Sequence, residues 1–424
     1  MKNNVKKLLC AALSTAMIAG SIVLPMTASA ETTPIFDGDT VEQEWKFDFG
    51  AAGTDAEDGY TLVTPDTNYV TNKEYGFLGI DDESYKLGNR YDGFGNQKGQ
   101  VIKLAAGGGE GLNDAIGSVG EDSFGNAGDV YYPTRFALKA DDEAYYRVRA
   151  TVTTLDTTKD AEISLYTERK HPIFTDTKVE AGQTKTVEFS VRPTPIYYEK
   201  SEPKGTIADG MVNVCVAGEN SAIASIEIQK VQEYPVFWVL GDSTVTDGNC
   251  SLPFFRLQNY TGVGTGLTKY LPRNYAMVNE GEGGLNAADN YHFNMVKSRI
   301  KAGDFLYVEY GHNHKSDGPT GYVSNLDKYY DACHSVGATL VIVSPIERIN
   351  TFTDGAYQHT LDGFATAGAQ YVADKVTAGA TDIAYVDLNS YSLDFYNKVT
   401  TDNNGDENAI KFYFQTAKGG GTDR

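Results

Sequence analysis

Apolar and polar residues alternate along much of the chain between about residue 36 and residue 232. Alternating segments occur at residues 146–152, 163–165, 187–191, 212–216 and 223–228. Turn-forming residues such as Gly182, Pro193 and Gly218 separate them. Many short segments of this period predict strands with one buried face, so we expect a β-sandwich or jelly roll. Residues 107–128, which are rich in Gly, Asp, Asn and Ser, are expected to form a long surface loop.

The pattern changes near Tyr234 and Pro235. Continuous apolar runs follow at residues 236–240, 275–279, 305–308, 340–343 and 383–386. Helix-like stretches lie between some of them, at residues 324–335 and 361–376. Apolar strands that alternate with helices indicate a parallel sheet in a three-layer α/β domain. We therefore expect a multidomain chain, with a β-sandwich domain at residues 31–232 and an α/β domain at residues 233–424.

Three loops that follow apolar runs of the α/β domain carry distinctive residues. Ser243 stands in the stretch Gly241-Asp242-Ser243-Thr244, a glycine-rich turn ends at Gly284, and Asn313 closes Gly311-His312-Asn313. In a parallel sheet the carboxyl ends of the strands lie at one edge, where ligands bind. A serine nucleophile needs hydrogen-bond donors for a developing oxyanion, and backbone N–H groups of a glycine turn and an asparagine amide are suitable donors.

These motifs resemble the first three blocks of the SGNH (GDSL) hydrolase superfamily. Within it, residues 304–313 and 341–348 are similar to the rhamnogalacturonan acetylesterase group. Upstream, residues 47–50 and 75–77 resemble the galactose-binding-like β-domain that often precedes this catalytic domain in bacterial members. The resemblance covers most of the chain after residue 30, and it implies a flavodoxin-like hydrolase fold.

The resemblance implies a role for each matching residue. Ser243 would be the nucleophile, and its N–H an oxyanion donor. Gly284 would supply a second N–H, with Gly283 as the alternative register, and Asn313 would supply its side-chain amide. The chain departs from the group at Leu285-Asn286, where Arg-Ser is usual, and at His314, where Asp is usual. These departures affect expected substrate contacts more than the hydrolytic centre.

The last block of the family is Asp-x-x-His, in which the Asp orients the His that acts as general base. Asp423 stands where that Asp belongs, and the chain ends at Arg424. We therefore expect a chain that stops just before its catalytic base. Such a chain should have strongly reduced activity, whereas the full-length protein is expected to be an esterase. If the chain is nevertheless fully active, His314 is the first candidate for the base.

The N-terminus predicts export. Lys2, Lys6 and Lys7 precede an uncharged stretch, and Ala28-Ser29-Ala30 follows it. A basic start, an apolar middle and small residues at the end are typical of a secretory signal peptide, here residues 1–30. We expect a secreted, extracellular protein without a membrane span, because no comparable apolar run occurs later.

Charge and cysteine content narrow the functional classes. Removing residues 1–30 takes away three of the 36 basic residues and none of the 57 acidic ones, so the net charge becomes −24. Such a chain is not held on nucleic acid by bulk charge. The three remaining cysteines, Cys215, Cys250 and Cys333, exclude a disulfide scaffold. No zinc-type cluster occurs, and the acidic loop at residues 402–406 lacks the EF-hand pattern. The resemblance implies that the reaction needs neither a metal nor an organic cofactor.

The resemblance implies hydrolysis of acetyl esters on a pectic polysaccharide through an acyl-serine intermediate. The acidic surface suits such an acidic substrate poorly, so a neutral acetylated hemicellulose stays open. Two other classes also stay open. One is a non-catalytic carbohydrate-binding protein that uses exposed aromatic rings, although we expect most rings, Trp45 and Trp238 included, to be buried. The other is an SGNH lipase or thioesterase.

Overall fold

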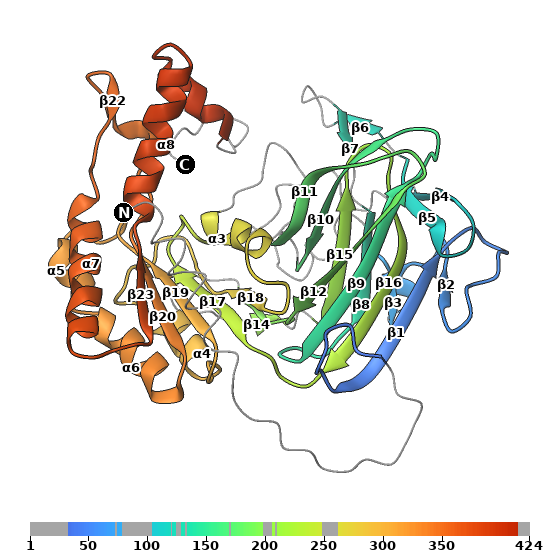
Figure 1. Ribbon diagram of the computed structural model, residues 1–424, viewed down its shortest axis with the longest axis horizontal. Coiled ribbons are helices and arrows are strands. Elements are labelled where there is room, and N and C mark those ends of the chain that lie inside the picture. The colour runs from blue at the N-terminus through green and yellow to red at the C-terminus, as the bar shows by residue number, and fades with distance from the viewer. Residues whose placement is uncertain are drawn as a thin grey trace. The chain divides into compact units, whose positions relative to one another are not determined.

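The computed structural model describes residues 33–72, 74–78, 104–119, 121–123, 129–131, 134–168, 171–197, 206–207, 210–247 and 262–413. The described residues after Thr33 fall into one compact unit. This unit holds two large sheets of mainly antiparallel strands and one parallel sheet (Figure 1). The predicted signal peptide and Asp423 lie outside the described residues. The domain boundary at residues 232 and 233 stays a prediction.

The first large sheet has the strand order β12-β9-β16-β1-β2, and β5 joins it through β16. All its pairs are antiparallel except that of β1 with β2. Its strands are β1 (Val41–Phe49), β2 (Thr61–Val63), β4 (Leu104–Gly108), β5 (Asp114–Ser118), β9 (Tyr145–Thr154), β12 (Thr184–Val191) and β16 (Ser221–Val231).

The second large sheet is antiparallel and has the order β11-β10-β15-β8-β3. Its strands are β3 (Tyr75–Phe77), β8 (Thr134–Lys139), β10 (Ala161–Thr167), β11 (His171–Val179) and β15 (Met211–Ala217). Two small ladders lie outside both sheets, formed by β6 (Glu121–Ser123) with β7 (Asp129–Tyr131) and by β13 (Ile196–Tyr197) with β14 (Thr206–Ile207).

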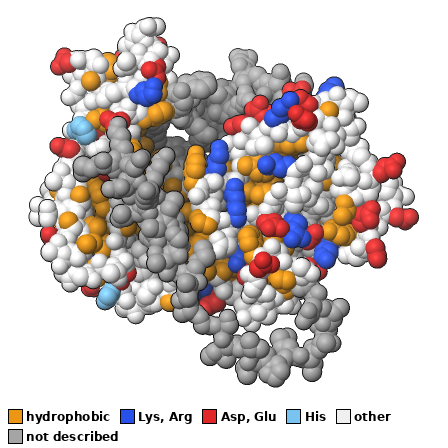
Figure 2. Space-filling view, in the orientation of Figure 1, with side chains coloured by type: hydrophobic (Ala, Val, Ile, Leu, Met, Phe, Trp, Pro, Cys, Tyr) orange, Lys and Arg blue, Asp and Glu red, His pale blue; other side chains and the backbone are white. Residues whose placement is uncertain are grey.

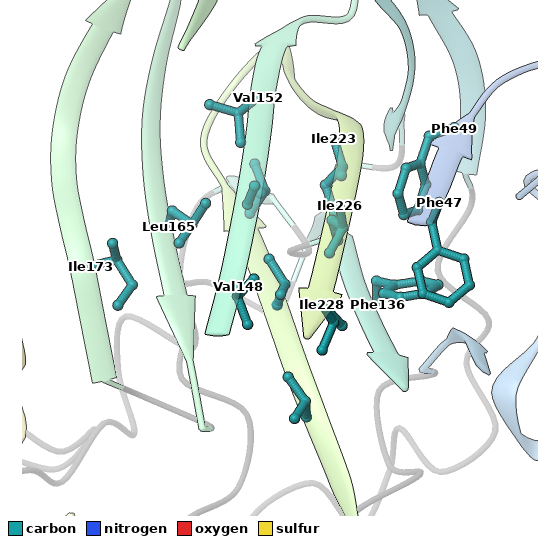
Figure 3. Close-up of a cluster of buried hydrophobic side chains, with 14 of the residues drawn as sticks. Phe47, Phe49, Phe136, Val148, Val152, Leu165, Ile173, Ile223, Ile226 and Ile228 are labelled. Atoms are coloured by element: carbon teal, nitrogen blue, oxygen red, sulfur yellow. The ribbon is translucent and has the colours of Figure 1, made fainter. Parts of the chain in front are cut away.

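One hydrophobic core joins these two sheets. Figure 3 shows Val148, Val152 and Ile226 from the first sheet in the same cluster as Leu165 and Ile173 from the second. All five side chains are fully buried. The alternation in the sequence therefore identified inward-facing positions of the strands, although β15 and β16 are buried on both faces.

Two details of the sequence prediction were wrong. Much of the expected loop at residues 107–128 is structured: β4 pairs with β5, and η2 (Gly111–Asn113) connects them. Its glycines reflect close packing, since a Cβ on Gly107 would lie 2.4 Å from the carbonyl oxygen of Leu155. Trp45 is half-buried rather than buried, and its ring packs against Tyr146 at the rim of the core.

The parallel sheet has the order β18-β17-β19-β20-β23. Its strands are β17 (Val236–Gly241), β18 (Ala276–Asn279), β19 (Phe305–Glu309), β20 (Thr339–Val343) and β23 (Ile383–Val386), and every neighbouring pair is parallel. These are the five continuous apolar runs of the sequence. Burial on both faces explains why they do not alternate: Trp238 and Val239, which point to opposite faces, are both fully buried.

Helices cover this sheet and connect its strands. Residues of α4, α6 and α7 share one buried cluster with Trp238, Leu306 and Ile342 of the sheet. Gly337, in a left-handed conformation, ends α6. The helices are α2 (Tyr69–Asn72), α3 (Val263–Gly266), α4 (Tyr291–Lys297), α5 (Gly318–Val323), α6 (Leu326–Val336), α7 (Asp362–Thr377) and α8 (Leu388–Asp402), with short 3-10 turns η4 (Leu267–Lys269), η5 (Ile349–Thr351) and η6 (Glu407–Tyr413), and a small hairpin of β21 (Phe352–Thr353) and β22 (Ala356–Tyr357).

Candidate functional site

The candidate site lies at the carboxyl edge of the parallel sheet, where β17, β18 and β19 are neighbours. The loop with Ser243 follows β17, the glycine turn follows β18, and the loop with Asn313 follows β19. Because adjacent parallel strands end at the same edge, the topology alone brings these three loops together. Hydrogen bonds within and between the loops fix how they meet.

Asp242 shapes the turn that carries Ser243. Its Oδ1 accepts hydrogen bonds from the Thr244 N–H at 3.0 Å and the Thr244 hydroxyl at 2.9 Å. Its carbonyl oxygen accepts the N–H groups of Val245 and Thr246, both at 3.2 Å. Ser243 therefore sits at the tip of a tight turn and remains partly exposed, whereas Asp242 is fully buried.

The glycine turn after β18 packs directly against the Ser243 turn. The Glu282 N–H donates to the carbonyl oxygen of Gly241 at 3.1 Å. A Cβ built on Gly283 would lie 3.7 Å from the Cβ of Ser243. Gly284 has a φ of +87°, a conformation that favours glycine. The first and second loops are thus in contact at Ser243.

The third loop reaches the second through Asn313. Its Nδ2 donates to the carbonyl oxygen of Leu285 at 2.7 Å, one residue beyond Gly284. This contact uses one of the two amide hydrogens of Asn313. Ser243, Gly284 and Asn313, far apart in the sequence, therefore lie on loops that touch one another at one edge of one sheet.

Three N–H groups at this edge are available to a ligand. Within the described part of the chain, the backbone N–H groups of Ser243 and Gly284 have no acceptor, and the second amide hydrogen of Asn313 has none either. The Gly283 N–H, in contrast, donates to Glu282 Oε1 at 2.8 Å. This difference favours Gly284 over Gly283 as the donor of the second loop.

His312 lies close to the Ser243 turn but is held by a basic partner. The Arg348 Nε–H donates to His312 Nδ1 at 3.0 Å, so the neutral ring carries its proton on Nε2. Burial, opposed by the charge of Asp242 and reinforced by that of Arg348, lowers the pKa of His312. A neutral ring with its Nδ1 lone pair engaged is poorly suited to take the proton of Ser243.

His314 is fixed within its own loop. Its Nε2 accepts the Ala287 N–H at 3.0 Å, which places the ring proton on Nδ1, 3.1 Å from Asp317 Oδ1. The side chain is fully buried and packs near Tyr322 and Phe364. Both ring nitrogens are used structurally, so this geometry offers no support for His314 as a general base.

Two Asp-x-x-His pairs that the sequence reasoning passed over are also structural. Asp289 accepts the N–H of His292 at 3.0 Å at the start of α4, and the ring of His292 is buried. His334, three residues after Asp331, lies in the last turn of α6 and pairs with Asp382 at 2.6 Å. That turn precedes β20, so it is at the opposite edge of the sheet from Ser243. Among the described residues, no histidine hydrogen-bonds to Ser243.

The second antiparallel sheet contacts the loop that follows Ser243. His171, on β11, lies with its Nε2 2.8 Å from Oδ2 of Asp247. Asp247 Oδ1 also accepts from the Thr265 hydroxyl at 3.0 Å and from Asn279 Nδ2 at 2.8 Å. Burial raises the pKa of Asp247, but the charge of His171 and these hydrogen bonds outweigh burial and hold that pKa below its ordinary value. No sequence motif pointed to this pair, because its members are 76 residues apart.

The described residues also address the expectations about metal binding, membrane spans, exposed aromatic rings and surface charge. The described residues contain no group of three or more His, Cys, Asp or Glu side chains placed to hold a metal ion. None of the described helices is both long and apolar enough to span a bilayer. The exposed large aromatic side chains in the described ranges are Tyr270, Tyr391 and Phe395, all beyond residue 232. Acidic side chains are spread over the described part of the face shown in Figure 2.

No family model and no curated protein matches the chain. Similar solved structures include the Bacillus subtilis protein YxiM, with 18% identity and a TM-score of 0.36, covering 84% of this chain and 88% of that one. A family two carbohydrate esterase from Clostridium thermocellum has 12% identity and a TM-score of 0.28 over 68% and 88% of the two chains. A putative GDSL-like lipase from Bacteroides ovatus has 13% identity and a TM-score of 0.30 over 66% and 82%. Structural neighbours thus include a carbohydrate esterase and a GDSL-like lipase.

Proposed function

We propose that the chain is a serine ester hydrolase whose nucleophile is Ser243. The observation that carries the proposal is that the loops of Ser243, Gly284 and Asn313 contact one another at one edge of the parallel sheet, and that each of these residues has an N–H group without an acceptor within the described part of the chain. Donors fixed around the position of a developing oxyanion are the commonest way in which acyl-transfer enzymes lower their barrier. No metal or organic cofactor enters the proposal.

In the proposed reaction, Ser243 Oγ attacks the acyl carbon and loses its proton to a base. The carbonyl oxygen becomes an oxyanion that accepts hydrogen bonds from the three donors. Collapse of this intermediate releases the alcohol, and water then hydrolyses the acyl-serine. The resemblance to the SGNH family assigns the orientation of the base to Asp423.

The hydrogen bonds of the described histidines affect the expected rate of ester hydrolysis. His312 and His314 have Nδ1 and Nε2, respectively, engaged as acceptors, so neither is free to accept the Ser243 proton in this arrangement. A serine without a base is a weak nucleophile at neutral pH. We therefore expect slow hydrolysis by the 424-residue chain and acceleration by an added base.

For the substrate, we propose a secreted carbohydrate esterase that removes acetyl groups from a plant cell-wall polysaccharide of the pectin or rhamnogalacturonan type. The support is the similarity of residues 304–313 and 341–348 to the rhamnogalacturonan acetylesterase group, together with the predicted signal peptide. The net charge of −24 after its removal keeps a neutral acetylated hemicellulose as the second candidate.

The test compares acetate release from acetylated pectin and acetylated xylan by the chain and by Ser243→Ala, with and without imidazole, at two salt concentrations. Imidazole should accelerate hydrolysis by the unsubstituted chain well beyond its effect on Ser243→Ala. Equal rates for the two proteins under all conditions would refute a nucleophilic Ser243. A higher rate on xylan at both salt concentrations would reject the pectic substrate but retain the esterase.

A further inference from the structure

Four hydrogen-bonded side chains link the end of β19 to the Ser243 turn, and all of them except the partly exposed Thr244 are buried. The Tyr307 hydroxyl donates to Glu309 Oε2 at 2.5 Å. Glu309 Oε1 is 3.0 Å from the Thr244 hydroxyl oxygen, which is itself 2.9 Å from Asp242 Oδ1. Glu309 and Asp242 are both fully buried. Glu309 ends β19 and Asp242 begins the turn after β17, so the hydrogen-bonded side chains link the ends of two neighbouring strands.

The hydrogen atoms shared by these four side chains can be counted. Thr244 Oγ1 has one hydrogen and two carboxyl oxygens at hydrogen-bonding distance. If both carboxyl groups were ionised, one of these two contacts would place oxygen lone pairs against each other. A proton on Glu309 Oε1 resolves the conflict, because Glu309 then donates to Thr244 and Thr244 donates to Asp242. The Tyr307 hydroxyl already supplies the proton between itself and Glu309 Oε2.

The surroundings also favour a neutral Glu309. Neither Glu309 nor Asp242 forms a salt bridge with a described cation, and the nearby Arg348 directs its Nε–H to His312. Burial raises the pKa of Tyr322 on α5 and of Tyr396 on α8, and the negative charge of ionised Glu309 adds to the rise in both. Burial, reinforced by the negative charge of Asp242 and opposed by the hydrogen bonds from Tyr307, Thr244 and the Ile346 N–H, raises the pKa of Glu309 to about 7. An uncompensated buried charge is costly, so Glu309 keeps its proton up to about pH 7.

We propose that Glu309, in its protonated form, is a positioning residue that holds the Ser243 turn through Thr244 and Asp242. Asp242 accepts the N–H groups of Thr244, Val245 and Thr246, so the set of its hydrogen bonds decides the shape of the turn. When Glu309 loses its proton, two carboxylates compete for the single hydrogen of Thr244. The turn is then held less firmly. The catalytic consequence rests on the proposed function, whereas the proton-sharing arrangement does not.

The arrangement is tested by following backbone N–H resonances of the full chain by NMR between pH 5.5 and pH 8. In the unsubstituted protein, the Thr244 amide should titrate with a midpoint near 7, because its acceptor Asp242 responds to Glu309. Glu309→Gln, which mimics the neutral acid, should abolish this titration. Glu162→Gln, which removes an exposed carboxyl group on β10, should leave it unchanged. A Thr244 amide that does not titrate, or that titrates equally in Glu309→Gln, would overturn the proposal.

A second variant serves if Glu309→Gln does not fold. Thr244→Val removes the shared hydroxyl, and the Ile346 amide, which contacts Glu309 Oε1 at 3.4 Å, then reports on Glu309. Its midpoint should fall, because Thr244→Val removes the oxygen that accepts the proton of neutral Glu309 and also relieves the competition between the two carboxylates. An unchanged midpoint would contradict the bridge.

The catalytic consequence has its own readout. The ratio of the Ser243-dependent hydrolysis rate of the unsubstituted chain to that of Glu309→Gln should fall about tenfold between pH 6 and pH 8, as expected if only the protonated form of a group with a pKa near 7 is competent. A constant ratio beside a titrating Thr244 amide would show that the shared proton exists but does not position the nucleophile. Absence of any Ser243-dependent hydrolysis would refute the proposed function and leave the NMR test of the proton intact.

Discussion

Replacing His171 tests whether the antiparallel region supports the loop after Ser243. His171 Nε2 lies 2.8 Å from Asp247 Oδ2, and the two side chains are only 7% and 15% exposed. His171→Phe keeps a ring of similar size and removes the nitrogen that faces the carboxylate. Asp247 would then retain the hydrogen bonds from Thr265 and Asn279 but lose its ionisable partner His171.

The magnitude follows from the burial of the pair. A hydrogen bond to a charged group contributes about 1.5–3 kcal/mol, so we expect His171→Phe to lower the free energy of unfolding by about 2 kcal/mol at pH 7. The matched control is His334→Phe. His334 also pairs with a carboxylate, that of Asp382 at 2.6 Å, but its side chain is 63% exposed. An exposed pair contributes roughly 0–1 kcal/mol, so the control should lose less than 1 kcal/mol.

Urea unfolding, followed by fluorescence, measures both variants. The pKa of Asp247 is lowered in the folded protein, so its pairing contributes stability above the pKa of the unfolded state and loses it as the pH falls through the folded value. The deficit of His171→Phe should therefore be retained down to about pH 4, the ordinary range of a carboxyl pKa, and should become smaller only at lower pH. Equal losses for His171→Phe and His334→Phe, or a deficit that does not become smaller below about pH 4, would refute the reasoning.

Three further substitutions probe the site and its supports. Gly241→Ala would place a Cβ 2.5 Å from the carbonyl oxygen of Glu309 and should lower the free energy of unfolding by about 1–3 kcal/mol in the same urea titration. Gly283→Ala is the control and should cost less, because its Cβ would lie 3.7 Å from the Cβ of Ser243, an ordinary contact. The buried carboxylate of Glu347 accepts the Thr360 and Leu361 N–H groups, both at 2.7 Å, just before α7. Glu347→Gln removes the negative charge from these hydrogen bonds, so circular dichroism on heating should show a lower melting temperature than for Glu162→Gln. Asn313→Ala removes an oxyanion donor and should lower Ser243-dependent hydrolysis roughly 10²–10³-fold, and a loss below threefold would contradict that role.

Much of the fold could be predicted because its signals are local. The alternation at residues 146–152 and the apolar run at 236–240 both became strands, since burial of one or both faces leaves its own period in the sequence. Residues 107–128 were misjudged for a tertiary reason. Their glycines permit the close approach of Leu155 and Ser221 backbones, and composition alone cannot distinguish this from a loop.

The candidate site divides in the same way. Ser243, Gly284 and Asn313 could be placed together because parallel strands bring their carboxyl ends to one edge whatever lies between them. The roles of Glu309 and Asp247 could not be predicted. In the sequence, Glu309 only follows the apolar run at residues 305–308, with nothing to mark it as buried. The role of Asp247 depends on its contact with His171 from a distant strand. Their significance comes from burial and from partners far away in the sequence, which no local pattern records.

The central claim is that the Ser243 N–H, the Gly284 N–H and the Asn313 amide converge on one oxyanion position beside the Ser243 hydroxyl. Phenylboronic acid tests it, because addition of a serine hydroxyl to boron gives a tetrahedral anion. In an NMR titration of the chain, these three N–H signals should shift together with a single dissociation constant and should stay unshifted in Ser243→Ala. Shifts confined to one of the three groups, or shifts that persist in Ser243→Ala, would contradict the account.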